Sequence, residues 1–281
     1  MKRITALVLA AFASVASAQS RDWSSPQQPF TIYGNTHYVG TGGISAVLVT
    51  SPQGHILIDG ATVEGGKVIA DNIRTLGFKL EDIKYILNSH AHIDHAGGIS
   101  GLQKLTGATV LAGAANVQAL RTGIAPKEDP QFGALSNLPP TAKVQAVADG
   151  EVVKTGPLAI KAHSTPGHTP GGASWSWQSC EAGNCKIVVY GDSLSAVSAD
   201  SYRFTVHPEV VASLERSIGA VEKLPCDVLI TAHPEVNDLW GRQQRAAKEG
   251  GMAYVDPGAC RALAANSRKN LAKRLASEAK K

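Results

Sequence analysis

Four potential metal ligands lie within six residues of this chain, in the run HAHIDH at residues 90–95. The run follows residues 85–87 (YIL), a stretch typical of a buried strand. In an extended segment, residues two apart point to the same side, so His90 and His92 can bind one ion. As the chain turns before the next helix, Asp94 and His95 can face a neighbouring ion. Because buried imidazoles and carboxylates need compensating charge, the cluster predicts a metal site.

Two further histidines lie where loops are expected to leave strands. His168 lies in the turn 165–172 (TPGHTPGG), and His233 follows the strand-like run 227–230 (DVLI). Open α/β sheets build their sites at such positions. Imidazole and carboxylate ligands suit Zn²⁺, and a site without cysteine is typical of a catalytic zinc centre. The other histidines lack a second ligand at useful spacing, and we expect structural or surface roles for His37, His55, His163 and His207.

The N-terminus has the pattern of a signal peptide. Lys2 and Arg3 precede an apolar stretch, and residues 16–18 (ASA) form a small-x-small cleavage signal, so we expect cleavage after Ala18 and export. An uncleaved anchor helix is the alternative, but the apolar run is much shorter than the ~20 residues that span a bilayer. Without Lys2 and Arg3 the 27 basic residues fall to 25, against 23 acidic ones. A net charge of +2 gives little support to nucleic-acid binding.

The four cysteines allow three pairings in an oxidising compartment. Cys180 and Cys185 flank a four-residue turn between two strand-like runs, which favours a local disulfide, and Cys226 and Cys260 are then left to pair. A cysteine metal site is the alternative, although the chain lacks the Cys-x-x-Cys spacing of such sites.

Strand and helix patterns alternate along the chain, without repeats or low-complexity linkers. Strands are expected at 43–49, 55–59, 83–87, 108–111, 144–147, 151–153, 158–163, 172–178, 186–190 and 226–231, and helices at 64–76, 99–105, 114–121, 208–224, 235–249 and 258–279. Residues 123–142 are rich in Pro, Gly, Asn and Gln and predict a long surface loop, which is usually functional or mobile. This order predicts one α/β domain over residues 19–281. It is an αββα sandwich, with two mixed sheets face to face and helices on the outer faces.

The runs HAHIDH (90–95), PGHTPGG (166–172) and TAHPE (231–235) resemble, in order and spacing, the zinc motifs of the metallo-β-lactamase superfamily. The resemblance covers essentially the whole mature chain. The chain resembles subclass B3 in particular. The features shared with it are the export signal, the run Ser193-Leu194-Ser195, the Cys226–Cys260 pair and the N-terminal stretch RDWSSPQQPF. The resemblance implies a periplasmic β-lactamase that confers antibiotic resistance by opening the lactam ring of penicillins, cephalosporins and carbapenems.

The resemblance also implies which residues bind two zinc ions per chain. Carried over by position, the ligands of the first zinc are His90, His92 and His168, and those of the second are Asp94, His95 and His233. Other subclasses use a cysteine at the second zinc, and Ser193 stands in the matching place here, which favours B3. A zinc-bound hydroxide, oriented by Asp94 as the catalytic residue, would then attack the lactam carbonyl.

The substrate contacts are less sharply indicated. The resemblance implies that Ser193 and Ser195 bind the carboxylate of a β-lactam, and Gln131 in the long loop is expected to line the groove. Trp23 and Phe30 either cap that groove or pack against the surface. We expect a small-molecule substrate as the partner, with no nucleic acid, no membrane contact after cleavage of the signal, and a monomeric enzyme.

Three alternatives stay open. Asp192, in a Gly-Asp motif, would bridge both zincs in a hydrolase such as a glyoxalase II-like thioesterase, a phosphodiesterase or a lactonase. A non-catalytic zinc-binding exported protein is a further possibility. Asp59, before Gly60, is either a partner behind a metal ligand or a turn carboxylate.

Overall fold

The structure is a computed structural model that describes residues 22–280. The expected signal peptide, residues 1–18, lies outside this range and stays a prediction. In the described part of the chain, no helix combines the length and hydropathy needed to cross a membrane.

Two mixed sheets form the centre of the molecule. The first contains, in spatial order, β1 (Phe30–Tyr33), β2 (Thr36–Tyr38), β3 (Val47–Val49), β4 (His55–Ile58), β5 (Ile83–Leu87), β6 (Thr109–Gly113) and β7 (Val144–Val147). Its strands β1 to β4 pair antiparallel, and β4 to β7 pair parallel. The parallel half places the carboxyl ends of neighbouring strands at one edge, where the metal-ligand candidates follow.

The second sheet has the spatial order β12-β11-β10-β9-β8. Its strands are β8 (Val152–Thr155), β9 (Leu158–Ser164), β10 (Ala173–Glu181), β11 (Asn184–Gly191) and β12 (Val228–Thr231). Only the β11–β12 pair is parallel. Buried and exposed side chains alternate along β9, as expected for a strand with one face on the core.

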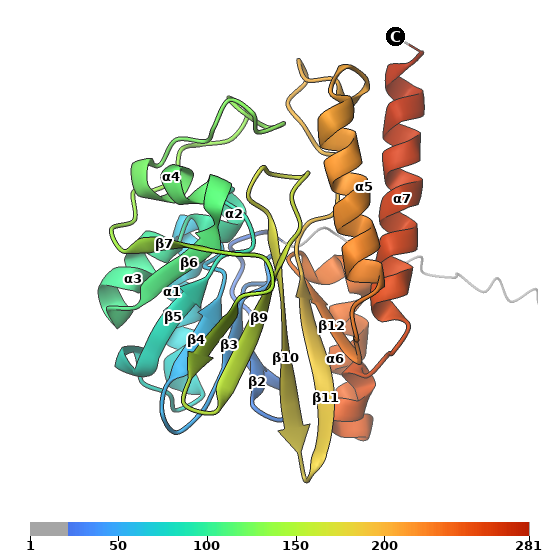
Figure 1. Cartoon of the computed structure of the whole chain (residues 1–281). Coiled ribbons are helices and arrows are strands. Elements are labelled where there is room, and N and C mark those ends of the chain that lie inside the picture. The colour runs from blue at the N-terminus through green and yellow to red at the C-terminus, as the bar shows by residue number, and fades with distance from the viewer. Residues whose placement is uncertain (1–21, 281) are drawn as a thin grey trace, which may run out of the picture.

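Helices cover the outer faces of both sheets (Figure 1). On the first sheet they are α1 (Val63–Thr75), α2 (Ile93–Ala96), α3 (Ile99–Thr106) and α4 (Ala114–Thr122), and on the second α5 (Pro208–Glu222) and α7 (Ala259–Glu278). The helix α6 (Leu239–Glu249) packs through Leu239 on the core between the sheets. Trp175 on β10 is completely buried in that core. The predicted αββα sandwich is confirmed.

The differences from the sequence prediction are local. The short strands β1 and β2 were not anticipated, because three or four residues carry too little alternation to be recognised. Asp94 and His95, expected in a turn, belong to the one-turn helix α2. Four 3₁₀ turns complete the connections: η1 (Leu80–Asp82), η2 (Phe204–Val206), η3 (Pro234–Asn237) and η4 (Gly250–Tyr254).

Both favoured disulfides are present. Cys180 and Cys185 face each other at the end of the β10–β11 hairpin, and their bond closes it. The Cys226–Cys260 bond joins the segment before β12 to the first turn of α7. The described residues therefore hold no free cysteine that could serve as a zinc ligand.

The carboxyl end of α7 holds the loop that follows β11. Arg274 donates through Nη2 to Ser198 Oγ (2.7 Å) and through Nε to Glu278 Oε1 (2.6 Å). Glu278 Oε2 in turn accepts from the backbone N–H of Thr205 (2.9 Å). These bonds fix the far end of the loop whose first residues include Ser193 and Ser195.

Candidate metal centre

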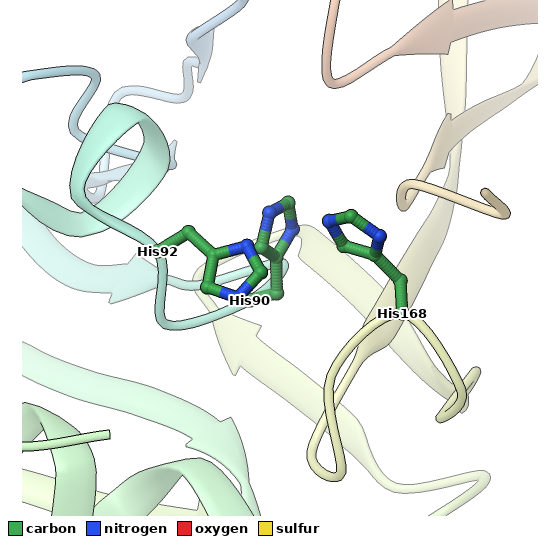
Figure 2. Close-up of side chains that lie close together, drawn as sticks. All are labelled: His90, His92 and His168. Carbon is green, nitrogen blue, oxygen red and sulfur yellow. The ribbon is translucent and has the colours of Figure 1, made fainter. Parts of the chain in front are cut away.

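The six predicted ligands come together at one edge of the sandwich. The segment from the end of β5 through α2 supplies His90, His92, Asp94 and His95. His168 comes from the loop between β9 and β10, and His233 directly follows Ala232 at the end of β12. Figure 2 shows His90, His92 and His168 converging from two separate loops.

The first cluster consists of three imidazoles. One nitrogen from each of His90, His92 and His168 lies within 4.8 Å of the other two. The second ring nitrogen of two of these histidines makes a hydrogen bond away from the cluster. His90 Nδ1 is 2.7 Å from Asp192 Oδ1, and His92 Nε2 is 3.1 Å from Asp129 Oδ2. His168 Nδ1 lies 3.0 Å from the carbonyl oxygen of Ser195. These contacts fix the ring orientations and leave His90 Nε2, His92 Nδ1 and His168 Nε2 facing inward.

The second cluster has the spacing of a tetrahedral metal site. Asp94 Oδ2 lies 3.1 Å from His95 Nε2 and 3.5 Å from His233 Nε2, and the two Nε2 atoms are 3.2 Å apart. Ligand bonds of about 2.0–2.1 Å in tetrahedral geometry place ligand atoms roughly 3.3 Å apart. The donor set therefore fits zinc in atom type and in separation.

Within residues 22–280, a buried nitrogen in each cluster lacks a hydrogen bond. His90 Nε2 and His95 Nδ1 are buried without a hydrogen bond. Such atoms are costly unless something else binds them. His90 Nε2 faces the inward nitrogens of His92 and His168, and a metal ion bound by these three nitrogens would satisfy it.

The electrostatics favour neutral imidazoles at His90, His168 and His233 and an ionised carboxylate at Asp94, whereas the charge of Asp94 outweighs burial and raises the pKa of His95. Burial and the neighbouring histidines lower the pKa of His168 to about 3, that of His233 to about 4, and that of His90 well below its ordinary value. Burial alone would raise the pKa of Asp94, but His95 and His233 outweigh it and lower that pKa. Metal ligands must be deprotonated, so the states of His90, His168, His233 and Asp94 suit metal binding.

Asp59 lies behind the second cluster and connects the two sheets. It accepts hydrogen bonds from Ser89 N (2.7 Å), Ser89 Oγ (2.6 Å) and, from the second sheet, Tyr190 OH (2.8 Å). Its Oδ2 is 3.8 Å from His95 Nδ1. Asp59 is completely buried and has a φ of 60°, which is uncommon outside glycine. These contacts correspond to the partner role and not to an exposed turn carboxylate.

Asp192 lies behind His90. Its Oδ1 contacts Nδ1, the nitrogen that faces away from the cluster, and its side chain is fully buried. Asp192 Oδ2 lies against Gly172, where any side chain would collide with it. This position differs from that of a carboxylate bridging two metal ions.

A pocket of ≈ 310 Å³ opens over both clusters, a size in the lower range of small-molecule sites. Its lining includes His92, Asp94, Gln131, His168, Ser193, Ser195, His233, Trp23, Glu235, Leu135, Val197 and Val236. Gln131 Nε2 lies 3.3 Å from His92 Nδ1, and Ser195 Oγ lies 3.2 Å from His168 Nδ1. Trp23 is in the lining, whereas Phe30 stacks on Tyr38 inside the core.

Two residues near the clusters, Asp129 and Glu235, were not predicted. Asp129 is a single carboxylate in an aperiodic loop, and only the folded chain brings it to His92. Glu235, inside the motif TAHPE, could have been noticed because it follows a ligand candidate by two residues. The remaining histidines lie elsewhere: His37 contacts Thr31, and His55, His163 and His207 contact Phe78, Ser176 and Tyr202, respectively.

Comparisons with known proteins show what the chain as a whole is similar to. The family model of the metallo-beta-lactamase superfamily matches residues 39–233. The crystal structure of metallo-beta-lactamase SMB-1 bound to 2-mercaptoethanesulfonate is 75% identical, with a TM-score of 0.91, and the match covers 92% of this chain and 100% of that one. MEM-A1, a subclass B3 metallo-beta-lactamase from a soil metagenome library, is 53% identical, with a TM-score of 0.90 and coverage of 92% and 99%.

A curated relative matches over a shorter segment. The N-acyl homoserine lactonase AttM of Agrobacterium fabrum (strain C58 / ATCC 33970) is 32% identical over 74 residues, which is 25% of this chain. The matched segment spans 28% of the lactonase.

Proposed function

The chain belongs to the metallo-beta-lactamase superfamily, and we propose that it is a zinc-dependent β-lactamase of subclass B3. One observation carries the proposal: two adjacent clusters of ligand atoms lie under a single pocket, in a chain 75% identical to a metallo-beta-lactamase over nearly its full length. The reaction class is hydrolysis of the amide bond in a β-lactam ring.

We assign two zinc ions to the centre. His90, His92 and His168 would hold one, and Asp94, His95 and His233 the other, since the ligand atoms within each set lie close together, and His90 also lies within ligand distance of Asp94 and His95. Zinc bound there would polarise the lactam carbonyl and make water acidic enough to supply a nucleophile near neutral pH. Asp94, an ionised carboxylate between the histidines, would orient the nucleophile and hold its proton.

The chain's own groups would position the substrate. Ser193 and Ser195 offer hydroxyl groups in the pocket wall beside His168, suited to the carboxylate that β-lactams carry. Gln131 reaches over the first cluster from the loop of residues 123–142 and offers an amide to the ring substituents. Penicillins, cephalosporins and carbapenems share these features, and we propose all three as substrates, with antibiotic resistance as the consequence.

The proposed biological setting is the periplasm. We infer that residues 1–18 direct export and are removed after Ala18, which leaves residues 19–281 as one domain. The two disulfides support an oxidising compartment. We propose that the enzyme acts as a monomer on small molecules, without a nucleic-acid or membrane partner.

A lactonase, phosphodiesterase or glyoxalase II-like thioesterase is the alternative, and the local likeness to AttM favours a lactonase among them. The position of Asp192 opposes this alternative, because its contact with His90 Nδ1 suits a supporting residue and not a bridging ligand.

Asp192→Asn separates the two possibilities. We expect this variant still to bind two zinc ions at saturation, with affinity reduced by about 10–100-fold because an amide replaces the carboxyl group that holds His90 Nδ1. Metal analysis and zinc titration measure both quantities, with Asp200→Asn, which neutralises an exposed carboxylate, as the control. A stoichiometry that falls to one zinc would favour a bridging Asp192 and the alternative.

The proposed substrate class is tested with the purified zinc-loaded protein. A cephalosporin, a carbapenem, an N-acyl homoserine lactone, a glutathione thioester and a phosphodiester are offered at equal concentration. We expect turnover of the two β-lactams to exceed that of the others by orders of magnitude. Turnover of the lactone, thioester or phosphodiester alone would overturn the proposal.

A further inference from the structure

Two exposed side chains flank His233 at one end of the pocket. The Trp23 ring is 5.9 Å from the His233 ring, centroid to centroid, and Trp23 is 45% exposed. Glu235 Oε1 lies 3.9 Å from His233 Nδ1, and its side chain is 63% exposed. Both residues line the same pocket as the metal clusters, so a bound molecule can contact them.

Apart from the two zinc ions proposed beneath it, the pocket has charge of one sign. Among the described residues that line it, the charged side chains other than histidine are Asp94 and Glu235, and no lysine or arginine is present. Asp94 belongs to the second cluster. In residues 22–280 Glu235 has no lysine or arginine nitrogen within 4.0 Å, and the nitrogen it contacts is His233 Nδ1.

We propose that Trp23 and Glu235 form a cation-accepting subsite, which makes β-lactams with a positively charged substituent preferred substrates. This inference rests on the proposed β-lactamase function. The face of an indole ring attracts a cation within about 6 Å of its centroid, and a nearby carboxylate adds a direct charge attraction.

The other polar wall of the pocket suits the opposite charge. Ser195 Oγ lies 3.2 Å from His168 Nδ1 and Ser193 lines the same pocket, while Trp23 and Glu235 lie against His233. A substrate with a carboxylate on its ring system and a cation on a substituent can therefore place each charge against a matching wall. Val197 and Val236, each 49% exposed, offer apolar contact to the stem that carries the cation.

The same arrangement disfavours a second negative charge. A substituent carboxylate placed at this subsite would lie near Glu235 without a lysine or arginine in the pocket lining to offset the repulsion. The effects are moderate, because both side chains are exposed and water and salt screen them. We therefore expect discrimination by a single order of magnitude.

The test compares two cephalosporins with the same ring system, one with a quaternary ammonium substituent and one with a carboxylate there. We expect the ratio of their kcat/KM values, cation over anion, to fall about tenfold in Glu235→Gln at low ionic strength, mainly through KM, and less at 0.5 M salt. Trp23→Leu should lower the ratio about two- to fivefold, and Trp23→Phe should restore part of it.

Glu249→Gln is the matched control, because it removes an equal charge from an exposed residue at the end of α6 that is not part of the pocket lining. It should leave the ratio unchanged. A ratio that stays within twofold of wild type in both Glu235→Gln and Trp23→Leu would overturn the subsite alone. Failure of the wild-type enzyme to hydrolyse either compound would overturn the proposed function and the subsite with it.

Discussion

Asp94→Asn should abolish most β-lactam hydrolysis and weaken binding of one of the two zinc ions. The Asp94 carboxylate is 3.1 Å and 3.5 Å from the two histidine nitrogens of the second cluster and is largely buried. An amide supplies no negative charge to the metal and cannot take up a proton. We expect kcat to fall by more than the ~10–100-fold that follows loss of a residue behind a metal ligand.

The measurement is steady-state hydrolysis together with zinc content after dialysis. Asp71→Asn, which alters an exposed ion pair on α1, is the control and should retain both activity and metal. An Asp94→Asn enzyme with two tightly bound zinc ions and wild-type turnover would show that Asp94 is neither a ligand nor a catalytic residue.

Asp59→Ala should be the most destabilising single substitution near the site. The change would leave the buried Ser89 N–H without its acceptor and would remove the shortest hydrogen bonds of two buried hydroxyls, those of Ser89 and Tyr190. Breaking such a buried network costs about 3–5 kcal/mol in the free energy of unfolding. The backbone at Asp59, with φ of 60°, adds strain for alanine.

Denaturant unfolding of the oxidised protein measures this change. Asp71→Ala should cost less than about 1 kcal/mol, because its ion pairs are exposed. Asp59→Asn should be intermediate, since an amide oxygen can still accept from two of the donors. An Asp59→Ala protein as stable as wild type would contradict the connecting role of this carboxylate.

The architecture could be predicted from the sequence because each helix and strand has a local pattern, and the order of these elements limits how the chain can fold. Alternation along β9 and helical spacing in α1 each identify an element within a few residues. The strand–helix order then leaves few ways to pack two sheets. The strands β1 and β2 were not predicted, because pairing with neighbouring strands stabilises them and their own residues show no clear alternation.

The metal ligands could also be predicted from local sequence patterns. Five of the six lie in short runs that carry several unusual residues at once, and His233 lies at a strand end. The carboxylates that contact these ligands were harder to predict. Asp129 lies 37 positions from its partner His92, and Asp192 lies 102 positions from His90. No local pattern encodes such pairs, and only the folded loops bring them together.

The central claim is a dizinc β-lactamase, and zinc titration of the metal-free mature protein during carbapenem hydrolysis tests it most directly. We predict no turnover after removal of metal with EDTA, recovery on addition of Zn²⁺, and saturation at two equivalents per chain. Turnover that persists in the metal-free protein, or a protein with two bound zinc ions that leaves the carbapenem and a cephalosporin intact, would contradict the account.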